Sequence, residues 1–414
     1  MKFIADFHLH SMYSRATGKN TDLENIDKWA KIKGVRVITC GDFTHPVWFK
    51  NLEQKLEPAE PGLFKLKDSK TETRFILTTE ISCIYTKKGK VRKIHIVIFL
   101  PSLEKVKEFN NRLGNIGNIR SDGRPILGLD VIELLKITLE VSQDCLFVPA
   151  HCLTPWFSIF GSKSGFDSIE ECFDDYAKHI YAIESGLSAD PSMIWRIPNG
   201  RRVAILSNSD AHSVEKIGRE ANVFDTKLDY YSILKAIKEK NPKEFLNTIE
   251  FYPQEGKYYN DGDRLCNISL NPKESFEYRE LCPVCGKRLV IGVLNRVQKL
   301  ADQDEGFVPE NAIPFKNIVP LKEIIGEAFG VGVVSKKVKA EYEKIIEHFS
   351  EFDVLLETPI EELKKIADSQ VVEGIYRSRI GKVNIQPGFD GVFGKVKIFS
   401  EIEKQNAIKQ RKLL

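Results

Sequence analysis

The sequence predicts an α/β protein, with a β/α barrel as the architecture of its first part. Three observations predict this: seven short apolar runs of strand type, helical segments between several of them, and His, Asp and Glu residues where the runs end. Alternating strands and helices are typical of α/β folds, and a barrel collects functional side chains at the C-terminal ends of its strands. The runs cover residues 3–6, 35–40, 75–79, 94–100, 145–149, 180–183 and 203–206.

The helices between these runs are indicated by apolar periodicity and by end signals. We expect the first over residues 21–33, with Thr21 and Glu24 as a capping box and Gly34 as the residue that ends it. Two more are expected over residues 103–113 and 130–139. Each would connect one strand to the next.

Histidines and carboxylates follow the predicted strands. In Asp6-Phe-His8-Leu-His10, two imidazoles two residues apart at a strand end point the same way and can reach one metal ion. Six of the eight histidines lie at or beside a strand end. Structural histidines satisfied by hydrogen bonds are the alternative, but they would not be distributed in this way. The expected metal ligands are His8, His10, His45, Glu80, His95, His151, Asp210 and His212.

This mixed set of nitrogen and oxygen donors suits zinc, manganese or iron, with magnesium also considered, and does not suit calcium. The donors exceed what one ion can use, so we expect two to three divalent ions. Ions about 3.5–4 Å apart activate water and stabilise a leaving oxygen, which is the chemistry of phosphate ester hydrolysis. We expect Glu80 to bridge ions, and Asp6, Asp42 and Glu184 to orient imidazoles. The expected catalytic residues are His8, His10, Asp42, Glu80, Glu184 and Asp210.

These motifs resemble those of the polymerase-and-histidinol-phosphatase (PHP) superfamily of metal phosphoesterases. The resemblance is carried by the Asp6-x-His8-x-His10 opening, by Asp42 with His45, and by the closing Ser209-Asp-Ala-His212. It implies a distorted seven-stranded β/α barrel with a trinuclear site. Such proteins usually have an Asp in a Ser-Asp-Gly context soon after the first motif, where this chain has Ser14-Arg15. The third ion therefore stays open, and Arg15 is either a phosphate contact or a plain loop residue.

A cysteine segment follows the barrel. Cys282-Pro-Val-Cys285-Gly is a tight turn that directs two thiolates at one ion, and Cys266 adds a third. Asp263 is the expected fourth ligand of one structural zinc ion. A turn without metal and a redox pair are the alternatives. The other five cysteines are scattered, as expected in a reducing compartment.

The C-terminal part is expected to be helical, mainly over residues 301–365. Gly330-Val-Gly332 lies between two helical segments, as in helix-hairpin-helix DNA binders, although a plain helical hairpin fits equally well. Gly388-Phe-Asp-Gly391 precedes basic residues and is read either as a phosphate contact or as a β-hairpin. Residues 364–414 carry 11 Lys or Arg against 5 Asp or Glu, which favours a polyanion partner or a solvated helix face.

The order of these features along the chain resembles endonuclease Q, a family of archaeal and bacterial DNA-repair enzymes. The resemblance implies a metal-dependent endodeoxyribonuclease that cuts the phosphodiester 5′ of deaminated nucleotides (hypoxanthine, uracil or xanthine) or abasic ones. It also implies three domains, a PHP-like catalytic barrel at residues 1–248, a zinc-binding domain at 249–300 and a helix-hairpin-helix-like DNA-binding region at 301–414. A sliding-clamp partner is considered, but the chain ends in Lys-Gln-Arg-Lys-Leu-Leu without a clamp-docking motif.

Several side chains are candidates for contacts with DNA. Trp156 and Phe157 follow His151 in a loop and could stack on a flipped base, although buried core aromatics are equally expected. The basic candidates, whose alternative is a solvated surface, are Arg15, Lys163, Arg196, Arg201 and Arg202.

Composition limits the remaining classes of protein. The chain has 414 residues, 42% hydrophobic and 29% charged, which is typical of a globular protein. It shows neither a signal peptide nor an apolar run long enough for a membrane span, so we expect a cytoplasmic enzyme without a membrane partner. Two alternative functions stay open: a phosphatase of small phosphate monoesters, and a non-enzymatic zinc-stabilised DNA-binding module.

Overall fold

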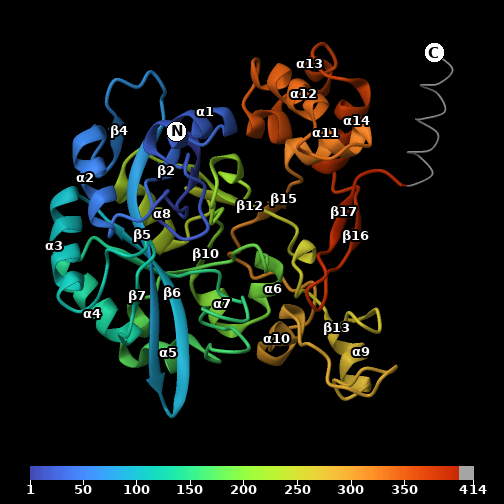
Figure 1. The fold of residues 1–414 in the computed structure, drawn as a ribbon, viewed down its shortest axis with the longest axis horizontal. Coiled ribbons are helices and arrows are strands. Elements are labelled where there is room, and N and C mark those ends of the chain that lie inside the picture. Colours follow the sequence, from blue (N-terminus) through green and yellow to red (C-terminus); the bar gives the residue numbers. More distant parts are fainter. Residues whose placement is uncertain (401–414) are drawn as a thin grey trace.

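The computed structural model describes residues 1–400 of the chain (Figure 1). The C-terminal residues, for which we expected no clamp-docking motif, lie outside these residues. So does part of the basic stretch 364–414. None of the described helices is long and apolar enough to cross a membrane.

A mixed sheet forms the centre of the first part. Among the described residues it has eleven strands in the order β15-β12-β11-β1-β2-β5-β4-β3, with β6 and β7 paired to β5 and β8 paired to β6. The strands are β1 (Lys2–Asp6), β2 (Val37–Thr39), β3 (Leu56–Pro58), β4 (Phe64–Leu66), β5 (Arg74–Lys87), β6 (Lys90–Leu100), β7 (Ile126–Leu127), β8 (Leu146–Pro149), β11 (Ala221–Asp225), β12 (Phe245–Glu250) and β15 (Phe315–Asn317).

The predicted α/β class is confirmed, but the sheet is not a closed barrel of seven strands. Strands β9 (Ala182–Glu184) and β10 (Ala204–Leu206) form a separate parallel pair. β5 and β6 form one long antiparallel hairpin that turns at Lys88-Gly89, where both residues have positive φ. β1 also pairs antiparallel with β11. Local apolar patterns did not reveal these pairings, because pairing depends on distant segments.

Helices cover this sheet on the left of Figure 1. The first, α1, begins after Asp22, whose side chain accepts a hydrogen bond from Asn25 N, so the predicted cap at Thr21 is wrong by one residue. Gly34 ends α1 in the left-handed conformation, as predicted. The helices are α1 (Leu23–Lys33), α2 (Pro46–Lys55), α3 (Leu103–Gly114), α4 (Val131–Val141), α5 (Ile169–Phe173), α6 (Pro191–Trp195), α7 (Pro198–Arg202) and α8 (Tyr230–Glu239), with 3₁₀ turns η1 (Asp174–His179) and η2 (Val214–Lys216).

The cysteine segment lies at the lower right of Figure 1. It contains η3 (Pro253–Glu255), the hairpin of β13 (Asp261–Asp263) and β14 (Ile268–Leu270), and helices α9 (Pro272–Glu277) and α10 (Val293–Leu300). After α10 the chain returns to the main sheet, where β15 pairs parallel with β12.

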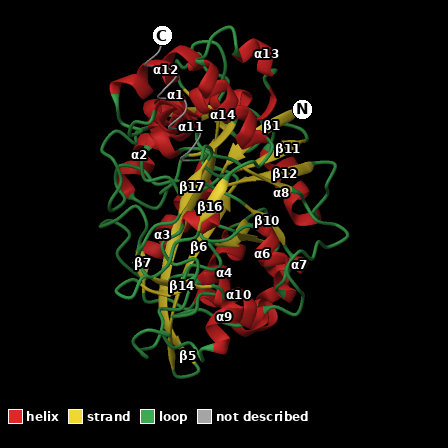
Figure 2. Cartoon of the chain, turned by 90° about the vertical axis from the view of Figure 1, so that its right-hand side faces the viewer, coloured by secondary structure: helices red, strands yellow, loops and turns green. Residues whose placement is uncertain are grey.

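The C-terminal helices form a compact group at the upper right of Figure 1. They are α11 (Leu321–Phe329), α12 (Lys336–Ile346), the π-helical turn η4 (Asp353–Glu357), α13 (Ile360–Leu363) and α14 (Ser369–Arg379). Glu351 fixes this group to α1, because its carboxylate lies 2.7 Å from Lys33 Nζ and also accepts from Tyr342 Oη at 2.6 Å. The strands β16 (Asn384–Gln386) and β17 (Lys395–Lys397) form a hairpin between this group and the cysteine segment (Figure 2).

Candidate metal centre

Four predicted ligands from three distant segments meet in one group. His8 and His10 follow β1, Glu80 lies in β5, and Asp210 follows β10. His10 Nε2 lies 3.2 Å from Glu80 Oε2 and 3.2 Å from Asp210 Oδ1. His8 Nε2 lies 3.5 Å from the same Glu80 oxygen and 3.7 Å from Asp210 Oδ1. Donor atoms this close on several sides form a cage of the size a metal ion needs.

A second group shares the carboxylate of Glu80 with the first. Glu80 Oε1 lies 2.7 Å from His95 Nδ1 in β6 and 3.2 Å from His151 Nε2 after β8. The two oxygens of Glu80 therefore face different sets of ligands. Glu80 therefore lies between the two groups, and its role as a bridge between ions stays a prediction.

Within residues 1–400, several donor atoms of the first group have no hydrogen-bond partner, although they are buried. His8 Nε2, His10 Nε2 and Asp210 Oδ1 are buried and have no hydrogen-bond partner among the described residues. A buried polar atom without a partner costs about 1–3 kcal/mol, so several at one place are typical of a site that binds a cation. The residues present therefore fit the predicted divalent ions.

Carboxylates behind the cage hold the imidazoles. His8 Nδ1 lies 3.0 Å from Glu184 Oε1, and His10 Nδ1 lies 3.0 Å from Asp42 Oδ1. A hydrogen bond at Nδ1 leaves Nε2 free as the metal-binding atom. Asp6 behaves differently, since its carboxylate accepts from the backbone N–H groups of Ser209 at 3.1 Å and Gly218 at 3.0 Å. It fixes the loop after β10 rather than an imidazole.

Burial and the neighbouring carboxylates shift the pKa values of these side chains in different directions. Burial lowers the pKa of His95 to about 4, so its ring is neutral near pH 7 as coordination requires. Burial alone would raise the pKa of Asp42, but the charge and hydrogen bond of His10 outweigh it and lower that pKa. For His8, burial opposes the charged ring, but the carboxylates of Glu184 and Glu80 raise its pKa well above the ordinary value.

Backbone strain is concentrated in the same loops. Asp42, His151 and Asp210 have φ values of 47°, 32° and 44°. Residues other than glycine rarely adopt this left-handed region, and such strain persists where surrounding contacts enforce it. The three side chains are thus aimed into the centre by turns that the sequence pattern did not reveal.

Two predicted ligands lie outside both groups. The ring of His212 lies 4.5 Å from that of His10, and its Nδ1 is 3.6 Å from Asp210 Oδ1, so it borders the first group. His45 precedes α2, and its ring stacks on Tyr13 at 4.5 Å.

Arg124 is a residue of the centre that sequence reasoning missed. Its Nη1 lies 3.0 Å from Glu80 Oε2. It follows Ser121-Asp122-Gly123, the tripeptide that PHP proteins usually have near the position of Arg15. The two segments are neighbours in space, because Arg15 N donates to Asp122 Oδ1 at 3.4 Å. The tripeptide was the available signal, but it lies far along the chain from the motif it accompanies.

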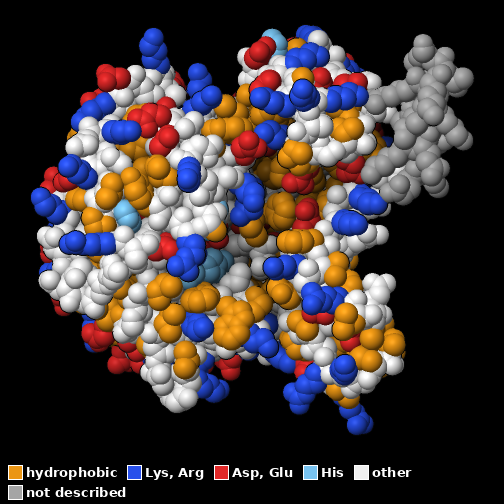
Figure 3. Space-filling view, viewed as in Figure 1, with side chains coloured by type: hydrophobic (Ala, Val, Ile, Leu, Met, Phe, Trp, Pro, Cys, Tyr) orange, Lys and Arg blue, Asp and Glu red, His pale blue; other side chains and the backbone are white. Residues whose placement is uncertain are grey.

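The predicted aromatic contacts lie at the edge of the second group. The ring of Phe157 is 4.6 Å from that of His95, and Trp156 is 51% exposed. Lys93 Nζ lies 5.1 Å from the Trp156 ring and 5.4 Å from the Phe157 ring. Figure 3 shows histidine side chains inside a hollow on this face, with Lys and Arg side chains around it.

The basic candidates fall into two sets. Arg15 and Lys163 are exposed. Arg196 is buried, and its Nε donates to Gln303 O at 3.3 Å. Arg201 donates with both terminal nitrogens to Asp302 at 2.7 Å, and Arg202 donates to Glu170. These three guanidinium groups bind other parts of the chain, and the structure does not bring them to the metal ligands.

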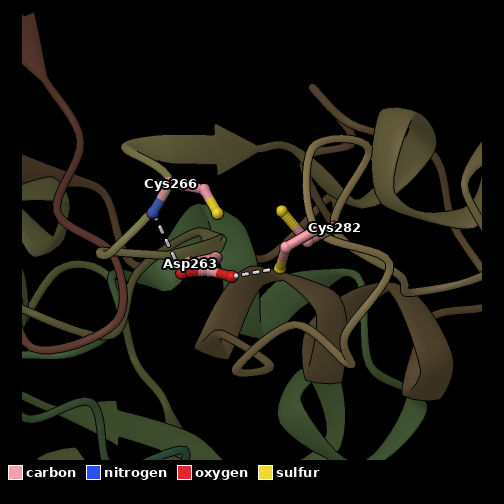
Figure 4. A group of neighbouring side chains, drawn as sticks. Asp263, Cys266 and Cys282 are labelled. Atoms are coloured by element: carbon pink, nitrogen blue, oxygen red, sulfur yellow. Dashed lines mark hydrogen bonds between the residues drawn. The ribbon is translucent and has the colours of Figure 1, made fainter.

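The cysteine segment holds a third group of donors. Asp263, Cys266, Cys282 and Cys285 place their ligand atoms within 4.8 Å of one another. Cys285 Sγ lies 3.2 Å from Asp263 Oδ2, and the other oxygen of Asp263 accepts from Cys266 N at 3.2 Å (Figure 4). Three sulfurs and one oxygen this close together are a donor set of the type that zinc takes.

The chain resembles known proteins along most of its length. Residues 320–382 match the family model described as the MJ0043 C-terminal domain. Protein YqxK of Bacillus subtilis (strain 168) is 30% identical, over 96% of this chain and 99% of that protein. Protein MJ0043 of Methanocaldococcus jannaschii is 34% identical over 65% of this chain, and the match spans 35% of that protein's own length.

Two solved structures share the whole fold. The lesion-specific endonuclease PfuEndoQ from Pyrococcus furiosus has a TM-score of 0.85 at 32% identity, covering 98% of this chain and 99% of that one. The chain belongs to the endonuclease Q family. An endonuclease Q complex with a 27-mer duplex, which has an abasic lesion at its active site, has a TM-score of 0.83 at 32% identity, covering 98% of each chain. Membership confirms the predicted family and its enzyme class, that of metal-dependent DNA endonucleases.

Proposed function

We propose that this chain cuts the DNA phosphodiester on the 5′ side of a damaged nucleotide, either deaminated (hypoxanthine, uracil or xanthine) or abasic. The observation that carries the proposal is the buried Glu80, whose two oxygens face two separate groups of metal donors. Paired ions are the usual apparatus for phosphodiester hydrolysis. The similarity to an endonuclease Q that holds an abasic duplex supports DNA as the substrate.

We place two divalent ions at Glu80, the first with His8, His10 and Asp210 and the second with His95 and His151. When bound, such ions activate a water molecule and stabilise negative charge on the phosphate. A third ion would need His212, which borders the first group, and His45, which lies outside both groups. Glu184 and Asp42 keep His8 and His10 oriented, so that the cage keeps its shape when substrate enters.

The damaged base would be received by Trp156 and Phe157. A base inside a duplex must be flipped out before it can be read at this centre, and flipping costs least at mispaired or missing bases. An exposed indole beside the second group offers a stacking surface, and stacking contributes about 1–3 kcal/mol per base. Lys93 adds a positive charge next to both rings.

The duplex on one side of the lesion would follow a groove towards the C-terminal helices. A cavity of about 510 Å³ lies between the loop after His212 and these helices, and it includes Val333 and Val334 of the Gly330-Val-Gly332 hairpin. Its cationic lining residues include Lys216, Arg219 and Lys339. Lys33 and Lys322 also line it, but they pair with Glu351 and Glu215. Phosphate contacts of this kind are independent of sequence, as a repair enzyme that scans DNA requires. Within the predicted division at residues 248 and 300, we propose that the first and third domains share these DNA contacts.

The cysteine group is proposed as a structural zinc site. Asp263 replaces a fourth thiolate or imidazole, so the site would bind zinc through three sulfurs and one oxygen. Its role would be to hold the β13–β14 hairpin and the Cys282–Cys285 turn together in a segment with few buried apolar side chains.

The test offers one preparation two sets of substrates: duplexes with a single hypoxanthine, uracil, xanthine or abasic site, and a panel of phosphate monoesters. We expect a single cut 5′ of each lesion, leaving a 3′-hydroxyl, and no cut in the undamaged duplex. Metal analysis should give about two to three ions in addition to one zinc per chain. Turnover of the monoesters alone would establish the phosphatase alternative, and lesion binding without cleavage at any added metal would establish the binding-module alternative.

A further inference from the structure

Arg124 lies beside the metal centre, and its side chain is partly exposed. Its Nη1 lies 3.0 Å from Oε2 of Glu80, the oxygen that also faces His8 and His10. The side chain of Glu80 is fully buried, whereas that of Arg124 is 27% exposed. The guanidinium group therefore lies between the buried carboxylate of Glu80 and solvent.

The backbone around Arg124 is fixed against the first motif. Gly123 N donates to Tyr13 O at 3.0 Å, and Arg124 N donates to Asp122 Oδ1 at 3.0 Å. A Cβ atom on Gly123 would lie only 2.4 Å from Oδ2 of Asp42, the carboxylate that orients His10. The loop that bears Arg124 is thus positioned by the same residues that position the metal ligands.

Arginines with a structural role in this chain use several guanidinium nitrogens in hydrogen bonds to other residues. Arg296 donates to Phe160 O at 2.8 Å, to Phe166 O at 2.9 Å and to Asp167 at 2.7 Å, and Arg201 uses both terminal nitrogens on Asp302. Among the described residues, the side chain of Arg124 makes its one hydrogen bond to Glu80, through Nη1. The other nitrogens of its planar fork remain available for a ligand.

We propose that Arg124 is a catalytic residue that binds a non-bridging oxygen of the scissile phosphate while it stays in contact with Glu80. The inference rests on the proposed hydrolysis of a phosphodiester. A guanidinium group matches the spacing of phosphate oxygens and stays charged throughout the pH range of proteins. It would add positive charge where negative charge builds up on the phosphate, and charge-stabilising donors in such positions change kcat by about 10²–10³-fold.

The test compares Arg124→Gln and Arg124→Lys with the wild-type protein, on an abasic duplex and on bis(4-nitrophenyl) phosphate. We expect Arg124→Gln to lower kcat about 10²–10³-fold on both, and Arg124→Lys to recover part of it, because lysine keeps the charge without the fork. Metal content per chain should not change. Titration calorimetry with inorganic phosphate should show binding weakened at least tenfold in Arg124→Gln. Arg112→Gln is the matched control, since Arg112 pairs with Glu108 and Glu140 on the surface of α3.

Two outcomes would overturn the inference. One is an Arg124→Gln protein that keeps the wild-type kcat and phosphate affinity. The other is a protein that loses metal and regains full kcat when more metal is supplied, because Arg124 would then only position Glu80. If the wild-type protein cleaves neither substrate, the proposed function fails instead, and the phosphate titration still decides the role of Arg124.

Discussion

Replacing Glu184 by glutamine tests how the metal centre is supported. The carboxylate of Glu184 is fully buried in β9 and accepts three hydrogen bonds, from His8 Nδ1 at 3.0 Å, His151 N at 2.8 Å and Asn208 Nδ2 at 2.8 Å. A glutamine has the same shape, but its NH₂ group would face one of these donors. His8 would then lose the partner that fixes its tautomer and makes its Nε2 a stronger ligand.

The expected effect is a 10–100-fold loss of metal affinity in Glu184→Gln, because such loss is typical when a carboxylate behind a metal-binding histidine is removed. This corresponds to about 1.4–2.8 kcal/mol of binding free energy. The assay titrates metal-depleted protein with manganese or zinc and follows binding by calorimetry, with the zinc of the cysteine group counted separately. Asp42→Asn should behave in the same way, because Asp42 supports His10 as Glu184 supports His8.

The matched control is Asp229→Asn, a change of the same chemistry at the N-cap of α8, far from the donors. Metal affinity within twofold of wild type in Glu184→Gln would refute the reasoning, provided that circular dichroism shows a folded protein. A loss equal to that of the Asp229→Asn control would refute it as well.

Further predictions concern stability and substrate contact. Burial raises the pKa of Glu250 to about 7, so the folded protein retains this proton over a pH range in which the unfolded chain loses it. The free energy of unfolding should therefore fall between about pH 4.5 and 7 and stay constant above pH 7. In Glu250→Gln, the melting temperature should fall less over the same pH range. Gly123→Ala should cost about 1–3 kcal/mol in urea unfolding, because the new Cβ meets Asp42; an unchanged midpoint would contradict the contact. Cys282→Ser should lose one zinc per chain and melt at a lower temperature, whereas the exposed-surface change Lys107→Gln should do neither. Trp156→Ala should weaken lesion binding by about 1–3 kcal/mol in fluorescence anisotropy, and equal affinity for damaged and undamaged DNA in the wild type would remove the basis for this role.

Features that depend on neighbours in sequence were predictable. The strand at the N-terminus, the two histidines that leave it in the same direction and the glycine that ends α1 were predicted and are present. The Cys-x-x-Cys turn likewise defined a donor pair through its spacing alone. Six of the eight predicted ligands of the active centre lie in the two groups that share Glu80.

Features that depend on distant segments were not predictable. The open sheet follows from pairings such as β1 with β11 and the hairpin of β5 with β6, and apolar runs do not encode pairing. Arg196 was predicted as a DNA contact, yet it is buried and donates to Gln298 and Gln303, about a hundred positions later. Arg124 gave no local signal of its own, because its importance comes from its distance to Glu80.

The sequence by itself determined the chemistry of this protein: which donors are present, their spacing within each motif, and the family they resemble. The tertiary structure alone decided their geometry: which donors face each oxygen of Glu80, His45 apart from the cage, and Arg124 beside Glu80. The physical reason is that the two kinds of feature depend on interactions over different distances along the chain. Side-chain direction within a strand or turn is fixed by a few backbone angles, whereas the distance between residues many positions apart is fixed by the packing of the whole sheet.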